Sequence, residues 1–265
     1  MEDAAAPAPE MAGKVALVVG GASGIGYAAA ALMAQRGARV VILSDRGVDE
    51  AVALAARRGI ALEGLTGDAS ISAVVKGAVA HAVHRYGGLH VTVHTAVVHP
   101  YGNAGDTSED TWDRVMAVNV KSVYLLAHHA IPQMLLQREG SIVNVSSVQA
   151  TSCQRDVSAY TTSKTAILGF TRSLAVDYSG RGIRANSVSP GPIRTPLLNL
   201  AVEKFGNGRP ADEVFAGWGQ GVPMGRIGEA EEVAEVIAFA ASPRSSYCSG
   251  SEFVVDGGTL VKSGI

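Results

Sequence analysis

The chain has few cysteines, few aromatic residues, little net charge and no long apolar run. Its two cysteines are too few for a disulfide framework or a four-thiolate metal site, so we expect reduced thiols in a reducing compartment. The net charge of −2 gives no electrostatic reason to expect nucleic acid or an anionic membrane as a partner. No apolar stretch reaches the roughly 18 residues that a membrane span needs. A cytoplasmic globular protein is therefore expected.

The N-terminal segment MEDAAAPAPEMAG is acidic, rich in Pro and Ala, and lacks the apolar core of a secretory signal. We expect residues 1–11 to form a disordered tail and residues 12–265 to form a single domain. A length of 265 residues is typical of one α/β unit, and the 31 glycines indicate tight turns and backbone that approaches a ligand closely.

Apolar runs of strand length alternate with longer segments of helical periodicity. Strands are expected at residues 14–20, 39–44, 61–67, 89–98, 140–147, 183–191 and 251–258, and helices at residues 24–37, 48–59, 71–88, 108–138, 158–179 and 229–241. This alternation predicts an α/β fold, a single doubly wound parallel sheet (Rossmann fold) with helices on both faces. Residues 193–228 are less periodic and rich in Gly and Pro, and we expect them to form a substrate lid.

A glycine-rich loop, VVGGASGIG, lies between the first expected strand and the first expected helix, with Gly20, Gly24 and Gly26 recurring. In a doubly wound sheet, a loop at this position lets backbone N–H groups and the helix N-terminus meet a pyrophosphate. Glycines also serve ordinary tight turns. The position directly after a strand and at the start of a helix nevertheless favours a dinucleotide site.

The second expected strand ends in ILSDRG, which bears on the coenzyme. Asp45 follows the glycine loop by about 20 residues, the spacing of an acid that hydrogen-bonds ribose hydroxyls. A carboxylate here repels a 2′-phosphate, so NAD is favoured over NADP. The neighbouring Arg46 leaves NADP open, because a guanidinium can hold that phosphate.

The segment SAYTTSKTAILGF places Tyr160 and Lys164 at i and i+4 of a helix, on one face. A phenol with a pKa near 10 is a poor base at neutral pH. An ammonium ~4 Å away, at an effective dielectric of about 20, stabilises the phenolate by roughly 4 kcal/mol before desolvation opposes it. The pair therefore predicts a tyrosine whose pKa is lowered toward the working pH.

Six landmarks then follow one another in a familiar order. They are the glycine loop (similar to TGxxxGxG), an Asn within MAVNVKS, a Ser ahead of the tyrosine, YxxxK, SPG followed by TP, and a final VDGG. With these motifs the chain resembles the classical short-chain dehydrogenase/reductase (SDR) family from about residue 12 to its C-terminus. The resemblance implies an NAD- or NADP-dependent oxidoreductase of CH–OH groups, assembled as a homotetramer or dimer.

The resemblance also implies roles for particular residues. Tyr160 acts as general acid/base, Ser147 hydrogen-bonds the reacting oxygen, Lys164 also holds the nicotinamide ribose, and Asn119 positions a water. Ser147 is chosen over Ser146 because it precedes the tyrosine by 13 residues. Coenzyme contacts are implied at Gly20, Ser23, Gly24, Ile25, Gly26, Asp45, Asp68, Ala69, Thr95, Ala96, Tyr160, Lys164, Pro190, Gly191, Ile193 and Thr195. Each catalytic residue also has a structural alternative: a surface Tyr–Lys contact, a core amide or a helix cap.

The chain departs from the family at two places. Val19 stands where threonine usually precedes the first glycine, and His94–Thr95–Ala96–Val97 replaces the common NNAG after the fourth strand. Losing both asparagines removes hydrogen bonds that tie this loop to neighbouring strands. Local repacking, lower coenzyme affinity and a changed role are the alternatives, of which repacking is favoured because the catalytic set is intact.

SVQA and the WG…PMGRIG stretch resemble the aldose (sugar 1-) dehydrogenases of the family. This implies a sugar or polyol substrate in contact with Ser147, Gln149 and Tyr160, with His99 and Trp218 as pocket walls. The apolar PIRTPLLNLAV equally suits an apolar cyclic or aromatic alcohol or ketone, including steroid and 3-oxoacyl types. A non-catalytic dinucleotide-binding regulatory protein is the alternative from another class.

Histidines occur in two pairs: His81 and His84 one helical turn apart, and His128 and His129 adjacent. No carboxylate or thiolate completes a ligand set around either pair, so no metal site is expected.

Overall fold

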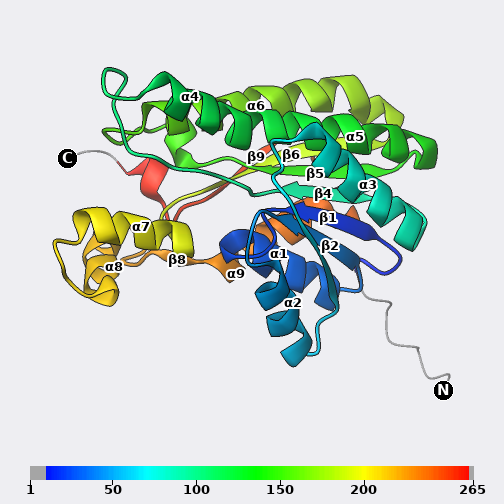
Figure 1. The fold of residues 1–265 in the computed structure, drawn as a ribbon, viewed down its shortest axis with the longest axis horizontal. Helices are drawn as coiled ribbons and strands as arrows, with labels where there is room; N and C mark the ends of the chain where they lie inside the picture. Colours follow the sequence, from blue (N-terminus) through cyan, green and yellow to red (C-terminus); the bar gives the residue numbers. More distant parts are fainter. Residues whose placement is uncertain (1–9, 263–265) are drawn as a thin grey trace.

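The computed structural model describes residues 10–262, in which seven strands form one parallel sheet (Figure 1). The strand order is β3-β2-β1-β4-β5-β6-β9, and every pairing is parallel. The strands are β1 (Val15–Val19), β2 (Arg39–Ser44), β3 (Leu62–Thr66), β4 (Val91–His94), β5 (Gly140–Val145), β6 (Ile183–Pro190) and β9 (Glu252–Val255). The chain order reverses between β1 and β4, which is where ligands bind in sheets of this kind.

Helices cover both faces of the sheet. Helices α1 (Gly24–Gln35), α2 (Val48–Arg57) and α9 (Ala230–Ala241) lie on one face, and α3 (Ser72–Tyr86), α5 (Ser122–Gln137) and α6 (Ser158–Tyr178) lie on the other (Figure 1).

Strand β1 supplies both hydrophobic cores, because successive side chains of a strand point to opposite faces. Ala16 and Val18 belong to the core that α1 and α9 complete, whereas Val15, Leu17 and Val19 belong to the core that α3 and α5 complete. A strand that is buried on both faces reads as a continuous apolar run, which is why the sequence pattern located it. The predicted doubly wound α/β fold is confirmed.

The helical stretch expected at 108–138 is divided. It consists of α4 (Glu109–Met116), a π-helical turn (Ala117–Lys121) and α5. The Ser108 hydroxyl caps α4 by accepting a hydrogen bond from the backbone N–H of Thr111. A π-helical turn adds a residue without ending the helix, and it commonly occurs at functional sites.

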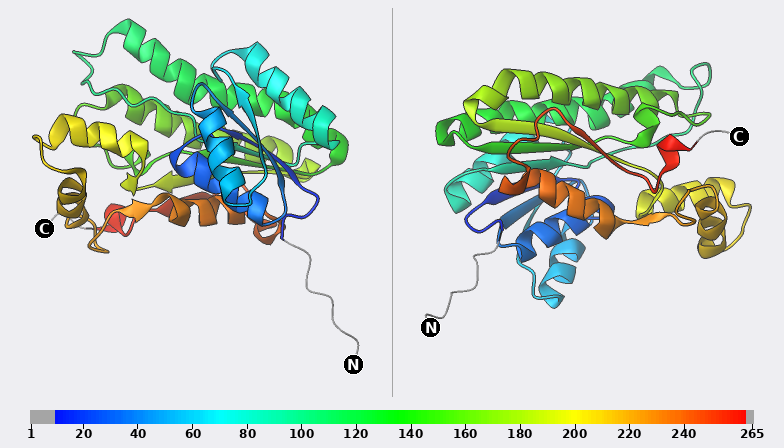
Figure 2. Two further views of the ribbon diagram at one scale, coloured as in Figure 1. Left: turned by 60° about the horizontal axis from the view of Figure 1, so that its bottom comes forward. Right: turned by 180° about the vertical axis from the view of Figure 1, so that it is seen from behind.

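Residues 193–228 contain regular structure that their sequence did not predict. They form β7 (Ile193–Arg194), α7 (Pro196–Phe205) and α8 (Ala211–Gly219), and β7 pairs with β8 (Gly228–Glu229). Figures 1 and 2 show α7 and α8 projecting beyond the layers of the main sheet. A separate small apolar cluster packs them together; it comprises Leu198, Val202, Val214, Phe215, Trp218 and Ile227.

Several expected boundaries shift. Met11 is fully buried and its backbone N–H donates to the Arg36 carbonyl at 2.8 Å, so the folded domain includes residues 10 and 11 of the expected tail. The rest of that tail, residues 1–9, lies outside the described residues. The strand expected at 89–98 ends at His94, opposite Val19, because β1 offers no partner beyond that residue.

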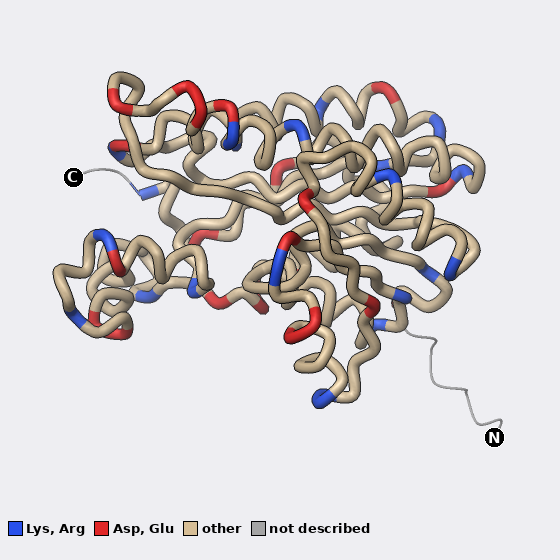
Figure 3. The backbone as a smooth tube through the Cα atoms, viewed as in Figure 1, with Lys and Arg blue, Asp and Glu red and all other residues tan. Residues whose placement is uncertain are grey.

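Short 3₁₀ turns complete the chain at Val148–Ala150, Ser179–Arg181, Pro243–Ser245 and Thr259–Val261. Within residues 10–262 the helices are too short or too polar to cross a bilayer. Acidic and basic residues intermingle over the helices and loops (Figure 3).

Candidate active site

Two adjoining cavities open at the carboxyl edge of the sheet. The first, of about 560 Å³, runs along the glycine loop between β1 and α1, and we call it the glycine-loop groove. The second, of about 550 Å³, surrounds Tyr160, and we call it the tyrosine pocket. The residues common to both cavities are Ile25, Thr95, Val97, Thr195 and Leu197. A ligand that fills the groove therefore borders any molecule in the pocket.

Glycines are required in the groove by close packing of the backbone. A Cβ on Gly26 would lie 2.1 Å from the Gly20 carbonyl oxygen, and one on Gly20 would lie 2.5 Å from the Ala96 nitrogen. Gly20 also has φ 81°, a conformation that side-chain-bearing residues rarely adopt. Ser23 and the first turn of α1 line the groove, so the free N–H groups and the positive end of the α1 dipole face it. No acidic residue in that turn neutralises the positive end. This is the cradle that a pyrophosphate needs.

Every residue for which coenzyme contact was predicted lines one of the two cavities. The groove is lined by Gly20, Ser23, Gly24, Ile25, Gly26, Asp45, Asp68, Ala69, Thr95, Ala96 and Thr195, and the pocket by Tyr160, Lys164, Pro190, Gly191 and Ile193. Arg114 and Leu200 also line the groove and were not predicted. No local motif marks either of them, because each reaches the groove from a helix distant in sequence.

The two aspartates of the groove differ in their surroundings. The Asp45 side chain is 58% exposed, with the Arg46 guanidinium 3.9 Å away, so both remain available to a ribose or its phosphate. Asp68 accepts hydrogen bonds from the Ser70 N–H at 2.8 Å and from Arg114 at 2.9 Å. Burial would raise the pKa of Asp68, but these bonds outweigh burial and hold that pKa below its ordinary value.

The altered loop after β4 makes its own hydrogen bonds to neighbouring elements, and its effect on coenzyme affinity stays a prediction. His94 is fully buried, and its Nε2 lies 2.6 Å from the Ser122 hydroxyl. Because Ser122 donates its own proton to the Val118 carbonyl, His94 Nε2–H must be the donor to Ser122. Burial lowers the pKa of His94 to about 3, so the ring is neutral. Thr95 ties the loop to β1 by donating both its N–H and its hydroxyl to the Val19 carbonyl at 2.8 Å.

Tyr160 and Lys164 share one face of α6 and are both buried. The lysine Nζ lies 5.6 Å from the centroid of the tyrosine ring and donates to the Val145 carbonyl at 2.9 Å. The structural alternative, a surface contact between Tyr160 and Lys164, is therefore wrong, because neither side chain is on the surface.

The predicted lowering of the tyrosine pKa is also wrong. Burial raises the pKa of Tyr160 to about 12, although the hydrogen-bonded Ser147 hydroxyl opposes the rise. Burial lowers the pKa of Lys164 to about 7, so the lysine loses much of the charge that would stabilise a phenolate. Desolvation outweighs the attraction between the two groups.

The two serines after β5 have different partners. The Ser146 hydroxyl donates to the Lys164 carbonyl at 2.8 Å and so fastens α6 to the sheet. Ser147 accepts a hydrogen bond from the Gln149 N–H at 3.2 Å and faces Tyr160 in the pocket. Of the two, Ser147 is the one hydrogen-bonded to Tyr160, and its role toward a substrate oxygen stays a prediction.

Asn119 lies in the π-helical turn and is fully buried. Its amide donates to the Val98 carbonyl at 2.9 Å and the Ser163 hydroxyl at 3.0 Å, and accepts from the Val98 N–H at 2.8 Å. These bonds join the loop after β4 to α6. The structural alternative of a satisfied core amide therefore holds, and the role of Asn119 with water stays a prediction.

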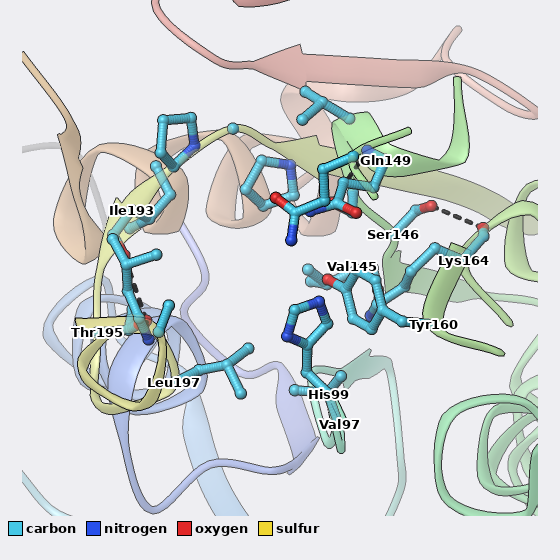
Figure 4. A pocket seen from close by; sticks show the side chains of 18 of the residues that line it. Val97, His99, Val145, Ser146, Gln149, Tyr160, Lys164, Ile193, Thr195 and Leu197 are labelled. Carbon is cyan, nitrogen blue, oxygen red and sulfur yellow. Dashed lines mark hydrogen bonds between the residues drawn. The ribbon is translucent and has the colours of Figure 1, made fainter. Parts of the chain in front are cut away.

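Polar and apolar side chains both line the tyrosine pocket. His99 packs edge-on against Tyr160 with ring centroids 4.0 Å apart, and Gln149 points into the same space from the opposite side (Figure 4). Trp218 also lines the pocket, as predicted for a wall residue. The apolar walls come from Val97, Val148, Leu197, Leu198, Ala201 and Phe205.

Both the sequence and the fold of this chain have known relatives. Residues 20–259 match a family model described as enoyl-(acyl carrier protein) reductase. A human dehydrogenase/reductase SDR family member 4 is 36% identical over 253 residues, which cover 94% of this chain and 88% of that protein. The chain belongs to the short-chain dehydrogenase/reductase family. It is an oxidoreductase that acts on CH–OH groups with a nicotinamide dinucleotide, so the non-catalytic regulatory alternative is set aside.

Relatives of this SDR are associated with different substrates. Cyclohexanol dehydrogenase from an Acinetobacter species is 36% identical over 253 residues, 92% of this chain and 94% of that protein. The ligand-free structure of Thermoplasma acidophilum aldohexose dehydrogenase is 35% identical, with a TM-score of 0.89 and 98% of each chain covered. Family membership thus establishes the reaction type, whereas the choice of substrate depends on the residues of the pocket.

The histidine pairs of this SDR form no metal centre within residues 10–262, where no group of three potential ligands comes together. His81 Nε2 lies 2.6 Å from Glu63, a contact that the sequence did not predict.

Proposed function

We propose that this SDR oxidises the ring hydroxyl of an uncharged aldose or a related polyol, with NAD as the favoured coenzyme. The observation that carries the proposal is the polarity of the tyrosine pocket. Lys164 is the only ionisable group of Asp, Glu, Lys or Arg type among the described residues that line it, whereas His99 and Gln149 each present a buried polar atom without a hydrogen-bond partner. A neutral polyhydroxylated ring supplies such partners. The likeness to an aldohexose dehydrogenase supports the same substrate class.

The residues of the pocket account for the proton transfer. Tyr160 is a neutral phenol at rest, so it must first release its own proton to the solvent. The phenolate oxygen then takes the proton of the substrate hydroxyl as the C–H bond at the same carbon gives up hydride, and it returns a proton to the oxygen in the reverse direction. Ser147 donates a hydrogen bond to the reacting oxygen, and the protonated Lys164 stabilises the phenolate form of Tyr160. When bound, the nicotinamide coenzyme accepts or supplies the hydride.

Asp45 supports the preference for NAD. Its exposed carboxylate lines the groove where β2 ends and would repel a 2′-phosphate. Arg46 lines the same groove and is 88% exposed. The competing arrangement, with Arg46 folded over a phosphate, predicts equal or better use of NADP.

An apolar cyclic alcohol is the second candidate. The side of the pocket formed by α7 and α8 is apolar, with Leu197, Leu198, Ala201 and Trp218 contributing. The relative described as cyclohexanol dehydrogenase supports this reading.

We also propose a homotetramer, or else a dimer, in the cytoplasm. Helices α5 and α6 expose Tyr124, Leu136 and Val176 on their outer faces, the last two by more than 80%. Large exposed side chains of this kind on long helices suit an interface between copies. Light scattering after gel filtration would measure the mass in solution.

The experiment is a substrate screen with purified protein. Aldoses, polyols, cyclohexanol and aryl alcohols are each mixed with NAD and, separately, with NADP, and reduced nicotinamide is followed by its absorbance. Turnover of aldoses above all other alcohols is the expected result. Turnover of cyclohexanol but of no aldose would replace the first candidate with the second, and faster reaction with NADP would overturn the role of Asp45.

A further inference from the structure

Two polar atoms in the tyrosine pocket are buried without a partner. They are His99 Nε2 and Gln149 Oε1, and the other described side-chain atoms in this condition belong to Glu10, Tyr27, Thr92 and Thr161, none of which lines the pocket. A buried polar atom without a hydrogen bond costs about 1–3 kcal/mol, so it is normally paired by a ligand or water. Both residues line the pocket that contains the phenol of Tyr160.

The position of His99 is set by aromatic packing. Its ring lies edge-on to Tyr160, at 4.0 Å between centroids and 85° between planes, and edge-on to Tyr101, at 4.8 Å. The imidazole is thus held between two rings and cannot turn freely. Burial and the neighbouring Lys164 lower the pKa of His99 to about 4, so the ring is neutral, with one N–H donor and one lone pair.

Gln149 faces His99 across the pocket. It lies in the 3₁₀ turn that Ser147 caps, and the Ser147–Gln149 hydrogen bond of 3.2 Å fixes the start of that turn. Figure 4 shows the Gln149 amide entering the pocket from the side opposite His99, with Tyr160 beside His99. An amide can donate or accept, so the two side chains together offer a neutral set of donors and acceptors.

We propose that His99 and Gln149 form a neutral polar clamp that selects substrates with a second oxygen on the carbon next to the reacting alcohol. This inference rests on the proposed function and deepens it, because it assigns the substrate class of the same pocket as a vicinal diol, an α-hydroxy ketone or a sugar ring. An alcohol without the neighbouring oxygen leaves both atoms unpaired. A pocket built to hydrogen-bond a hydroxyl rejects the analogue that lacks it.

The test compares two substrates that differ by one hydroxyl: trans-1,2-cyclohexanediol and cyclohexanol. For the wild-type enzyme with coenzyme, the diol should have a kcat/KM about tenfold or more above that of cyclohexanol. His99→Phe keeps an aromatic ring against Tyr160 and removes both nitrogens, and it should lower the diol-to-cyclohexanol ratio about tenfold. Gln149→Leu should lower the same ratio, and it serves as the test variant if His99→Phe does not fold. His99→Gln, which restores a polar atom near Nε2, should recover part of it.

His84→Phe is the matched control, since His84 is exposed on α3 outside both cavities, and it should leave the ratio unchanged. Calorimetric binding of each alcohol to the coenzyme-bound enzyme is measured alongside turnover, so that selective binding of the diol without turnover supports the clamp even where the proposed reaction fails. Equal use and equal binding of the two alcohols by the wild type would overturn the clamp while leaving the reaction type intact. The clamp would also be overturned if His99→Phe lowered the kcat/KM of both alcohols equally, or if neither alcohol bound to the wild type.

Discussion

At the scale of single residues, the site depends on charged and polar groups taken out of water. Lys164 is the sharpest case, because it is fully enclosed and its ammonium has one described protein partner, the Val145 carbonyl. Burial lowers the pKa of this lysine from its ordinary value of 10.5 to about 7. The folded protein therefore carries a penalty for the buried charge, and pH sets its size.

Replacing Lys164 should reveal that penalty. Below pH 7 the lysine is protonated in both the folded and the unfolded chain, so the full penalty for the buried charge lowers the stability. Between pH 7 and 10.5 only the unfolded chain keeps the proton, so wild-type stability rises with pH by about 1.4 kcal/mol per unit. Lys164→Met lacks this dependence. Its Tm relative to wild type should be greatest near pH 6 and fall steadily toward pH 9, measured by calorimetry.

Lys76→Met, at an exposed position of α3, is the control for that series and should show no such trend. A difference in Tm between Lys164→Met and wild type that is constant over the same pH range would contradict a lowered lysine pKa. Tyr160 does not blur the result, because its pKa is raised to about 12 and the phenol stays protonated in the folded chain throughout.

The residues that the sequence located are those whose partners are close in the chain. Tyr160 and Lys164 are one helical turn apart, and Ser147 follows a strand that the pattern predicted, so their common location at one edge could be foreseen. His99 could be suggested only as a wall. Its packing against Tyr160 joins residues of different elements, and the pKa values depend on burial that no local pattern encodes.

At the scale of elements, the glycine loop is held by contacts that leave no room for a side chain. Gly26→Ala would bring a Cβ to 2.1 Å from the Gly20 carbonyl oxygen, which the loop can relieve only by moving. Overpacking of this kind costs about 1–3 kcal/mol. The affinity for NAD should accordingly fall about 10–100-fold, measured by fluorescence titration.

Gly77→Ala gives the matched comparison. Gly77 lies inside α3, and a Cβ added there would meet no described atom within 4 Å, so alanine should stabilise the helix by about 0.5–1 kcal/mol and leave the NAD affinity unchanged. Retention of wild-type affinity by Gly26→Ala would show that the loop does not need its close packing.

The π-helical turn is the second element with a specific role. It presents Asn119 so that the amide joins Val98 and Ser163, and removing that side chain leaves both backbone groups of Val98 without their partner. Asn119→Ala should lower the free energy of unfolding by about 2–4 kcal/mol in urea. Asn199→Ala, at an exposed position of α7, should change it by less than about 0.5 kcal/mol. Equal stability of the two variants would remove the structural role of the turn.

Neither the π-helical turn nor the helices of residues 193–228 could be read from the sequence. The apolar spacing across 108–138 continues through the inserted turn, so periodicity indicates one long helix. Helices α7 and α8 are short, and their stability comes from the apolar cluster that contains Val214, Phe215 and Ile227 rather than from a strong local pattern.

At the scale of the whole molecule, the doubly wound sheet brings two cavities to one edge. Strands buried on both faces and helices of regular period made the architecture predictable, because each element follows a single local rule. The pocket is different: the loop after β4, strand β5 and helices α6 and α7 all contribute to its lining, and it exists only after these segments pack together. Substrate choice therefore depends on tertiary structure.

The central claim is that Tyr160 in this pocket transfers the substrate proton. The most direct measurement is the initial rate of NAD reduction by the best aldose of the screen, for wild type and for Tyr160→Phe, with NAD binding measured on both. We predict that Tyr160→Phe lowers kcat about 10²–10⁴-fold while NAD still binds. A variant that binds NAD and keeps more than about a tenth of the wild-type kcat would contradict the assignment.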